Sequence, residues 1–149
     1  RWLPWFHRDY SLIDAVKWFT LCASNQQAGT AYDLGIFSKS GTELFGGIAI
    51  NHIRSVTLIG NLGYWVRTTH QRRGIALEAL RRMVDFGFGE LRLERLEIVT
   101  AETNHPSRAL ATRIGARLEC IAPRRLRVNE DTHDAAIYSL VRKDPSSAG

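Results

Sequence analysis

The sequence predicts one mixed α+β domain, and two observations carry this prediction. Extended runs over 31–37, 43–53 and 58–66 follow one another with short polar connections, which is typical of an antiparallel meander. An amphipathic helix over 75–88 then leads into a further strand-like run over 92–102, and a strand–helix–strand order favours a parallel crossover. We therefore expect a central mixed, mostly antiparallel sheet with helices packed on it.

The composition limits the size of the fold and the class of ligand. The chain has 149 residues and 44% hydrophobic content, enough for a single domain over 1–149 and too little for two ordinary domains. The net charge of +5 favours an acidic ligand, a class that includes nucleotide phosphates, acidic proteins and nucleic acids. Because the arginines are spread over several predicted elements and no recognition-helix motif is present, nucleic acid is the minority interpretation.

The sequence also indicates a compartment and a redox state. There is no long apolar run and no signal segment, so we expect neither a membrane span nor secretion, and the default location is the cytoplasm. Cys22 and Cys120 lie far apart without a CxxC spacing, so we expect reduced cysteines and no metal site.

The predicted elements before the central helix rest on local signals. The segment 1–10 contains Trp2-Leu3-Pro4-Trp5 and is expected to be an ordered entry segment, because the proline cannot lie inside a helix. Ser11 and Asp14 resemble a capping box and predict a helix over 11–23, which the polar tract 24–30 ends. Gly46-Gly47 predicts a bulge or a close approach of another backbone.

The later elements follow from the same kinds of signal. Gly87 and Gly89 are expected to mark the end of the central helix. The remaining predictions are a helix over 105–114 that stops at a left-handed Gly115, strands over 116–121 and 135–141, a flexible acidic loop over 129–134, and a disordered tail over 144–149.

The loop that enters the central helix has the composition of an anion site. It reads Gln71-Arg72-Arg73-Gly74-Ile75-Ala76, and the first turn of a helix offers unpaired N–H groups together with the positive end of the macrodipole. Gly74 lets the backbone approach a ligand, and the two arginines add fixed charge, which favours a phosphate or pyrophosphate. The alternative is an ordinary surface loop, since Arg-Arg-Gly is common where a loop enters a helix.

The same loop matches the Q/R-x-x-G-x-G/A signature of the GNAT acetyltransferase family, and nearly the whole chain resembles the RimJ/RimL-like branch of that family. The resemblance rests on Trp2-Leu3-Pro4-Trp5, Phe45-Gly46-Gly47, Gly63-Tyr64-Trp65, the 71–76 loop, Glu102-Thr103-Asn104-His105-Pro106-Ser107, Ile114-Gly115-Ala116 and the closing 134–140. It implies a twisted sheet with a V-shaped splay and helices on both faces. The family's first strand and helix have no counterpart here, so either the chain is truncated or a partner completes the sheet.

The resemblance implies a cofactor, acetyl-CoA, and the residues that hold it. The loop over 71–76 would bind the pyrophosphate, and exposed amides of Val66 and Arg67 would hold the pantetheine arm as an added strand. Asn104 would contact the pantetheine. Arg113 could reach the 3′-phosphate of the adenosine, although a solvated helix face is the plainer account of this residue.

The catalytic residues that the resemblance implies are less complete. Where the family commonly has a Glu this chain has Asn61, and where it has a Tyr this chain has Ala111. Ser107 is then the candidate that protonates the thiolate, although it could simply bond backbone in the first turn of a helix. Glu102 and His105 are the candidates for the base, each with a plain structural alternative as a solvated strand end or a helix cap. A water relay with Asn61 is a further candidate for this catalytic step. Glu119 and the arginines at 124, 125 and 127 could line an acceptor cleft or be ordinary exposed charge.

We therefore expect an acetyl-CoA-dependent N-acetyltransferase whose acceptor is most simply a protein N-terminal α-amine of the ribosomal-protein type. One alternative is a small-molecule amine acceptor, such as an aminoglycoside or a polyamine. Another is a non-catalytic acyl-CoA sensor that keeps the pyrophosphate loop and has lost its base and acid. The sequence does not decide the oligomeric state, for which a homodimer is one option.

Overall fold

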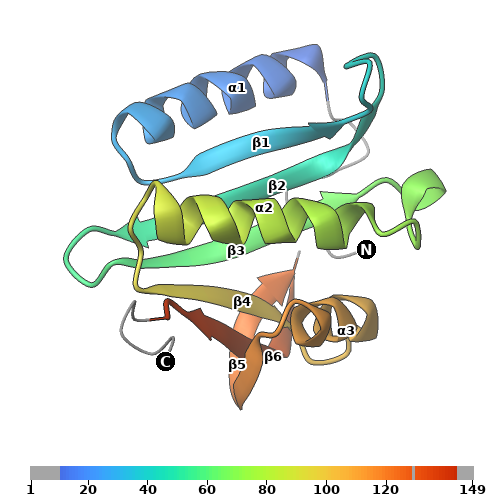
Figure 1. The fold of residues 1–149 in the computed structure, drawn as a ribbon. Coiled ribbons are helices and arrows are strands. Elements are labelled where there is room, and N and C mark those ends of the chain that lie inside the picture. Colours follow the sequence, from blue (N-terminus) through green and yellow to red (C-terminus); the bar gives the residue numbers. More distant parts are fainter. Residues whose placement is uncertain (1–10, 129, 144–149) are drawn as a thin grey trace.

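The computed structural model describes residues 11–128 and 130–143 (Figure 1). Its elements are α1 (Leu12–Gln27), β1 (Tyr32–Phe37), β2 (Leu44–Arg54), β3 (Ile59–Val66), a 3-10 turn η1 (Thr68–His70), α2 (Ile75–Gly89), β4 (Arg95–Ala101), α3 (His105–Arg113), β5 (Arg117–Val128) and β6 (Asp131–Val141). The sequence predictions for the entry segment and for the tail over 144–149 lie outside the described residues.

The strands form one mixed sheet in the order β1-β2-β3-β4-β6-β5 (Figure 1). β1, β2 and β3 pair antiparallel, and β4 joins β3 in parallel through the crossover helix α2. β6 and β5 continue the sheet in antiparallel pairing. The predicted meander and the predicted parallel crossover are both confirmed.

β3 and β4 remain paired only at one end. Their register runs over Ile59–Asn61 on β3 and Arg95–Glu97 on β4, although both strands continue for several residues beyond it. Past Asn61 and Glu97 the two strands therefore diverge and leave the V-shaped opening that the resemblance implied. Among the described residues, no strand lies between the inner edges of β3 and β4 in this opening.

Helices cover both faces of the sheet. On one face, α2 carries Gly87 against the sheet, where an added Cβ would lie 2.9 Å from Ile50 and 3.0 Å from Leu96. Tyr32 of β1 meets Phe86 of α2 on this same face, with ring centroids 5.4 Å apart. The next residue, Asp33, points to the opposite face because strand side chains alternate, and there it neighbours Cys22 of α1.

The apolar core lies between α2 and the sheet. Its fully buried side chains come from the face of β2 and β4 that α2 covers, from α2 itself and from the connection after α2; the largest are Ile50, Leu80, Leu93, Leu96 and Ile98. The residues that the helix period predicted for the apolar face of the central helix are therefore the ones that pack on the sheet, among them Leu80 and Met83. No helix of the described chain is long and apolar enough to cross a membrane.

Several boundary predictions are wrong for identifiable reasons. Gly87 does not end α2 but packs inside it, because only a residue without a side chain fits between Ile50 and Leu96 there. The polar tract over 24–30 does not end α1 at residue 23, since the helix continues to Gln27.

The predicted loop over 129–134 is also wrong where the structure describes it. Val128 is already paired with Asp131, and residues 131–134 belong to β6. Bulges in β5 interrupt the alternation of apolar and polar residues, and this hid the outer half of the hairpin from the sequence. The local signals elsewhere hold: Ser11 and Asp14 form the predicted capping box, and Gly115 has φ +88°.

Candidate active site

The loop before α2 presents unpaired backbone N–H groups to solvent. Gly74 is the N-cap with φ +78° and Arg72 has φ +61°, so the loop turns through two left-handed residues. The first intrahelical bond runs from Glu78 N–H to the Gly74 carbonyl at 3.0 Å, and no side chain caps the helix. The amides of residues 75–77 therefore have no intrahelical acceptor and are available to an anion.

A buried histidine fixes this loop to the sheet. His70 is 8% exposed and stacks on Phe45 of β2, with ring centroids 4.6 Å apart. Its Nε2 lies 3.0 Å from Glu43 Oε1 and its Nδ1 lies 2.8 Å from Thr69 Oγ1. On the far side of the loop, Gln71 donates through Nε2 to the Val66 carbonyl at 3.2 Å. The anion loop is thus held against the ends of both β2 and β3.

The inner edge of β3 directs backbone N–H and C=O groups away from β2, where an extended ligand could pair with them. Arg67 N–H donates to the Phe45 carbonyl at 2.8 Å, so the odd-numbered residues of β3 bond to β2. The alternate residues Tyr64 and Val66 direct their backbone groups into the V-shaped opening. The Val66 N–H therefore faces the opening, whereas the expectation of a free Arg67 amide is wrong.

Ser107 meets a partner that the sequence did not reveal. Its Oγ lies 2.8 Å from the phenol oxygen of Tyr64, which also lies 3.2 Å from the Ser107 carbonyl. Burial raises the pKa of Tyr64, and the hydrogen bond to Ser107 partly offsets this rise. Asn104, the N-cap of α3, accepts the Ser107 N–H at 3.3 Å, so it positions the serine. The hydroxyl groups of Tyr64 and Ser107 are therefore hydrogen-bonded to each other on the α2 face of the sheet.

Asn61 lies on the opposite face, at the point where the V-shaped opening begins. Its Nδ2 donates to Asn51 Oδ1 at 2.9 Å, while its Oδ1 is buried and has no partner within the described chain. Asn61 stands directly opposite Glu97 in the parallel register, so both side chains emerge side by side on the same face. The carboxylate missing at residue 61 is thus present one strand away. Only the strand register, which a sequence does not give, could have identified Glu97.

A charged network holds Glu97 in place. Arg95 donates through Nε to Glu97 at 2.8 Å and through its two terminal nitrogens to Glu119 at 2.8 and 2.5 Å. Ser139 donates to the same Glu119 at 2.7 Å. The hydrogen bonds from Arg95 and then from Ser139 lower the pKa of Glu119 to about 2. Glu119 is therefore a fixed anion that orients Arg95, and Arg95 in turn orients Glu97.

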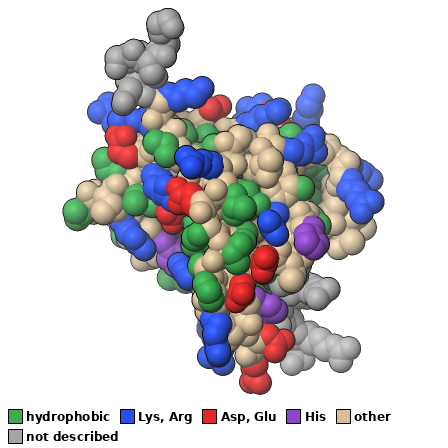
Figure 2. All heavy atoms as spheres, turned by 90° about the horizontal axis from the view of Figure 1, so that it is seen from below, with side chains coloured by type: hydrophobic (Ala, Val, Ile, Leu, Met, Phe, Trp, Pro, Cys, Tyr) green, Lys and Arg blue, Asp and Glu red, His purple; other side chains and the backbone are tan. Residues whose placement is uncertain are grey.

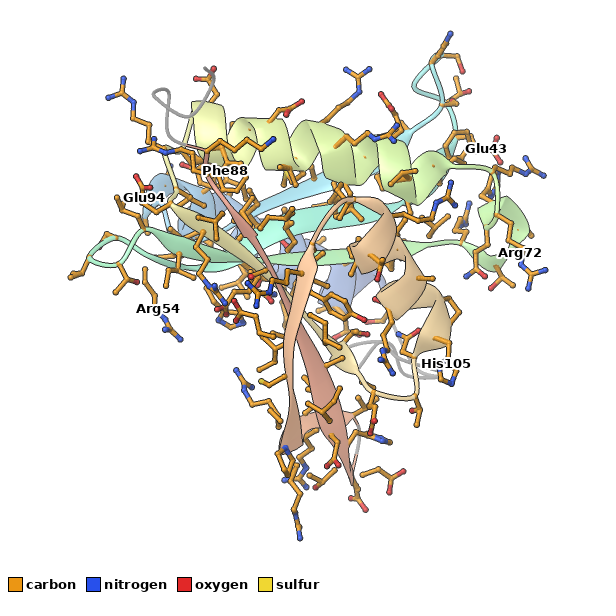
Figure 3. All side chains as sticks on the ribbon, turned by 60° about the horizontal axis from the view of Figure 1, so that its bottom comes forward. Glu43, Arg54, Arg72, Phe88, Glu94 and His105 are labelled. Atoms are coloured by element: carbon orange, nitrogen blue, oxygen red, sulfur yellow. The ribbon has the colours of Figure 1, made fainter. Side chains whose placement is uncertain are left out.

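The other predicted residues lie away from Asn61. Glu102 follows the end of β4, five residues beyond Glu97, a displacement of roughly 16 Å along a strand. His105 begins α3, and Figure 3 shows it at the same end of the sheet as Arg72. Arg113 is exposed in the last turn of α3. The structure therefore does not bring Glu102 or His105 to Asn61, whereas Glu97 stands beside Asn61 in the strand register.

A cavity of about 470 Å³ lies on the Asn61 face of the sheet. Its lining comes from the β2–β3 hairpin, from the start of β3, from the middle of β4 and from β5; the polar residues in it are His52, Arg54, Asn61, Glu97 and Arg125. The cavity and the anion loop thus lie on opposite sides of the V-shaped opening. Within the described residues, no group of His, Cys, Asp and Glu side chains could hold a metal ion.

Charge elsewhere on the surface is dispersed. Seen from below, basic side chains lie at several separate places with acidic side chains among them (Figure 2). On that face the net charge of +5 is therefore not gathered into one patch.

Comparisons with known proteins agree on one family. The family model described as an acetyltransferase (GNAT) domain matches residues 1–117. The chain is 33% identical over 142 residues to YdaF of Bacillus subtilis (strain 168), provisionally named a ribosomal N-acetyltransferase, and the match covers 95% of this chain and 68% of that protein.

Solved structures lead to the same group. One is a Vibrio cholerae protein provisionally described as a ribosomal-protein-serine acetyltransferase, with 34% identity, a TM-score of 0.79 and coverage of 89% of this chain and 76% of that chain. Another is the Microcin C7 self-immunity acetyltransferase MccE in complex with acetyl-CoA and AMP. It shows 26% identity, a TM-score of 0.82 and coverage of 89% of this chain and 73% of that chain.

Proposed function

The chain belongs to the acetyltransferase (GNAT) family, and from that premise we propose that its acceptor is the α-amine of a protein N-terminus. Membership of the family itself makes the protein an N-acetyltransferase that uses acetyl-CoA. The relatives are named as ribosomal-protein acetyltransferases, and an acceptor of that type would place the enzyme in the cytoplasm.

The described residues fit acetyl-CoA at two places. The uncapped amides of residues 75–77, with Arg72 and Arg73 beside them, suit a pyrophosphate. The inner edge of β3, at the backbone of Tyr64 and the N–H of Val66, suits the amide-bearing pantetheine arm, which can pair there as an added strand. When bound, acetyl-CoA supplies the acetyl group as a thioester.

The chain's own groups divide the chemistry between the two faces of the sheet. On the cavity face, Glu97 lies beside Asn61 and accepts an N–H bond from the incoming amine, which orients the amine. On the α2 face, the Ser107 hydroxyl holds a proton for the departing thiolate, and Tyr64 can replace that proton through the 2.8 Å contact between the two oxygens.

One observation carries the proposal. The parallel register ends at Asn61 and Glu97, so the sheet opens at the position where these two residues line the cavity. An amine in the cavity can therefore reach a thioester lying between β3 and β4. The volume of about 470 Å³ is within the range of small-ligand sites in proteins.

Two measurements test the proposal. Calorimetric titration with acetyl-CoA asks whether the cofactor site is intact, and its absence would overturn both the enzyme and the sensor interpretations. Release of free thiol is then followed with peptides that carry a free α-amine, with N-blocked peptides that carry only a lysine amine, and with an aminoglycoside and a polyamine. Turnover confined to free α-amines is the expected result. Turnover with the small amines alone would contradict it, and binding without turnover would favour the sensor.

A further inference from the structure

The cavity beside Asn61 holds more positive charge than amine binding requires. Two arginines line it, Arg54 from the β2–β3 hairpin and Arg125 from β5. Neither forms an ion pair with a described residue, whereas Arg95 on the same face is bound to two carboxylates. Figure 3 shows Arg54 at the end of the sheet opposite to Arg72, with its side chain directed away from α2.

A bulge aims Arg54 at the cavity. The β2–β3 register gains one residue on β2 between Asn51 and Arg54, so Arg54 rather than Ile53 stands opposite Ile59. Without this extra residue, Arg54 would point to the α2 face and Ile53 to the cavity. The bulge contains His52 at φ +50°, a conformation that costs a non-glycine residue free energy.

A second register shift lies next to Arg125. The β5–β6 register shifts between Ala122 and Leu126, and Arg124 within the shift has φ +49°. The Arg124 N–H donates to Asp134 Oδ1 at 2.8 Å, which fixes the distorted backbone. Arg125 follows this distorted segment and, like Arg54, lines the cavity without an ion pair to a described residue.

We propose that Arg54 and Arg125 select acceptors with a carboxylate close to the reactive amine, an inference that rests on the proposed function. Arginine recognises carboxylates through paired N–H donors, and the cavity supplies two such groups near the amine-binding end formed by Asn61 and Glu97. Arg54 faces Ile59, two residues from Asn61, a separation of roughly 7 Å along the strand. That distance corresponds to two extended residues, so the preferred acidic side chain is at the second or third position of the acceptor.

A matched peptide pair tests this selection. The peptides share a free N-terminal serine and differ only by Glu or Gln at the second position, with a second pair at the third position. The expected kcat/KM is about two- to fivefold higher for the Glu peptide of one pair, because an ion pair with an exposed arginine contributes about this much. The ratio should fall as salt concentration rises.

Variants separate the inference from the proposed function. In Arg54→Gln and in Arg125→Gln the Glu/Gln ratio should fall toward one, and Arg54→Glu should favour a Lys peptide over the Glu peptide. Arg81→Gln removes an exposed arginine of α2 and should leave the ratio unchanged. If the wild-type enzyme has equal kcat/KM for the Glu and Gln peptides of both pairs, the inference is overturned and the proposed function stands. Turnover of small amines without turnover of any peptide would overturn the proposed function itself.

Discussion

Replacing Gly74 by alanine should separate backbone strain from loss of the cofactor. Gly74 has φ +78°, and an added Cβ would meet nothing within 4 Å. The cost to folding is therefore conformational alone, about 1 kcal/mol once the lower entropy of the unfolded alanine chain is subtracted. For a chain of this length that lowers the Tm by about 3 °C. The new methyl group would, however, stand on the open surface of the anion loop, where a phosphate must approach the backbone.

Gly29 provides the matched control. It follows α1, has φ +67°, and likewise has no atom within 4 Å of a built Cβ. Gly29→Ala and Gly74→Ala should lose similar stability in thermal unfolding, whereas only Gly74→Ala should weaken acetyl-CoA binding, by at least about tenfold or 1.4 kcal/mol in calorimetric titration. Wild-type affinity in Gly74→Ala would refute the assignment of this loop to the pyrophosphate. An equal loss of affinity in both variants would assign the effect to general destabilisation.

Three further predictions address the chemistry and the charged network. Ser107→Ala and Tyr64→Phe should each slow thiol release by about a hundredfold, and the double variant should be little slower than either, since both lie on one proton path; an unchanged rate in Ser107→Ala would remove the serine from the mechanism. Glu97→Gln should lower kcat about a hundredfold while acetyl-CoA affinity is retained, and Glu78→Gln on the exposed side of α2 serves as its control. The pKa of Glu119 is about 2 in the fold against 4.5 normally, so its contribution to stability is present above pH 4.5 and is lost as the pH falls toward 2. Urea unfolding between pH 2 and 6 should therefore show a flatter acid limb for Glu119→Gln, and parallel curves would contradict the assignment.

The sequence predicts the order of the elements and the anion loop because both depend on local signals. Hydrophobic period, a capping box at Ser11 and a glycine before α2 act within one or two turns of the chain. Features that depend on how two strands pair cannot be predicted from such local signals. The outer β5–β6 hairpin was predicted as a loop because its register shifts twice, and no periodicity survives such shifts. The bulge at His52 that redirects Arg54 escaped prediction for the same reason.

The prediction of catalytic competence also changes when the pairing of β3 with β4 is taken into account. Along β3 alone, Asn61 appears as a lost carboxylate, which favoured a weak enzyme or a sensor. In the sheet, Asn61 is paired in register with Glu97, and Arg95 fixes that glutamate through a bond at 2.8 Å. A carboxylate at both positions would place two like charges side by side at the opening, and one of them would have to stay protonated. An amide at residue 61 avoids this repulsion and donates through Nδ2 to Asn51. We therefore expect Asn61 to be compatible with catalysis, with Glu97 on the neighbouring strand as the carboxylate.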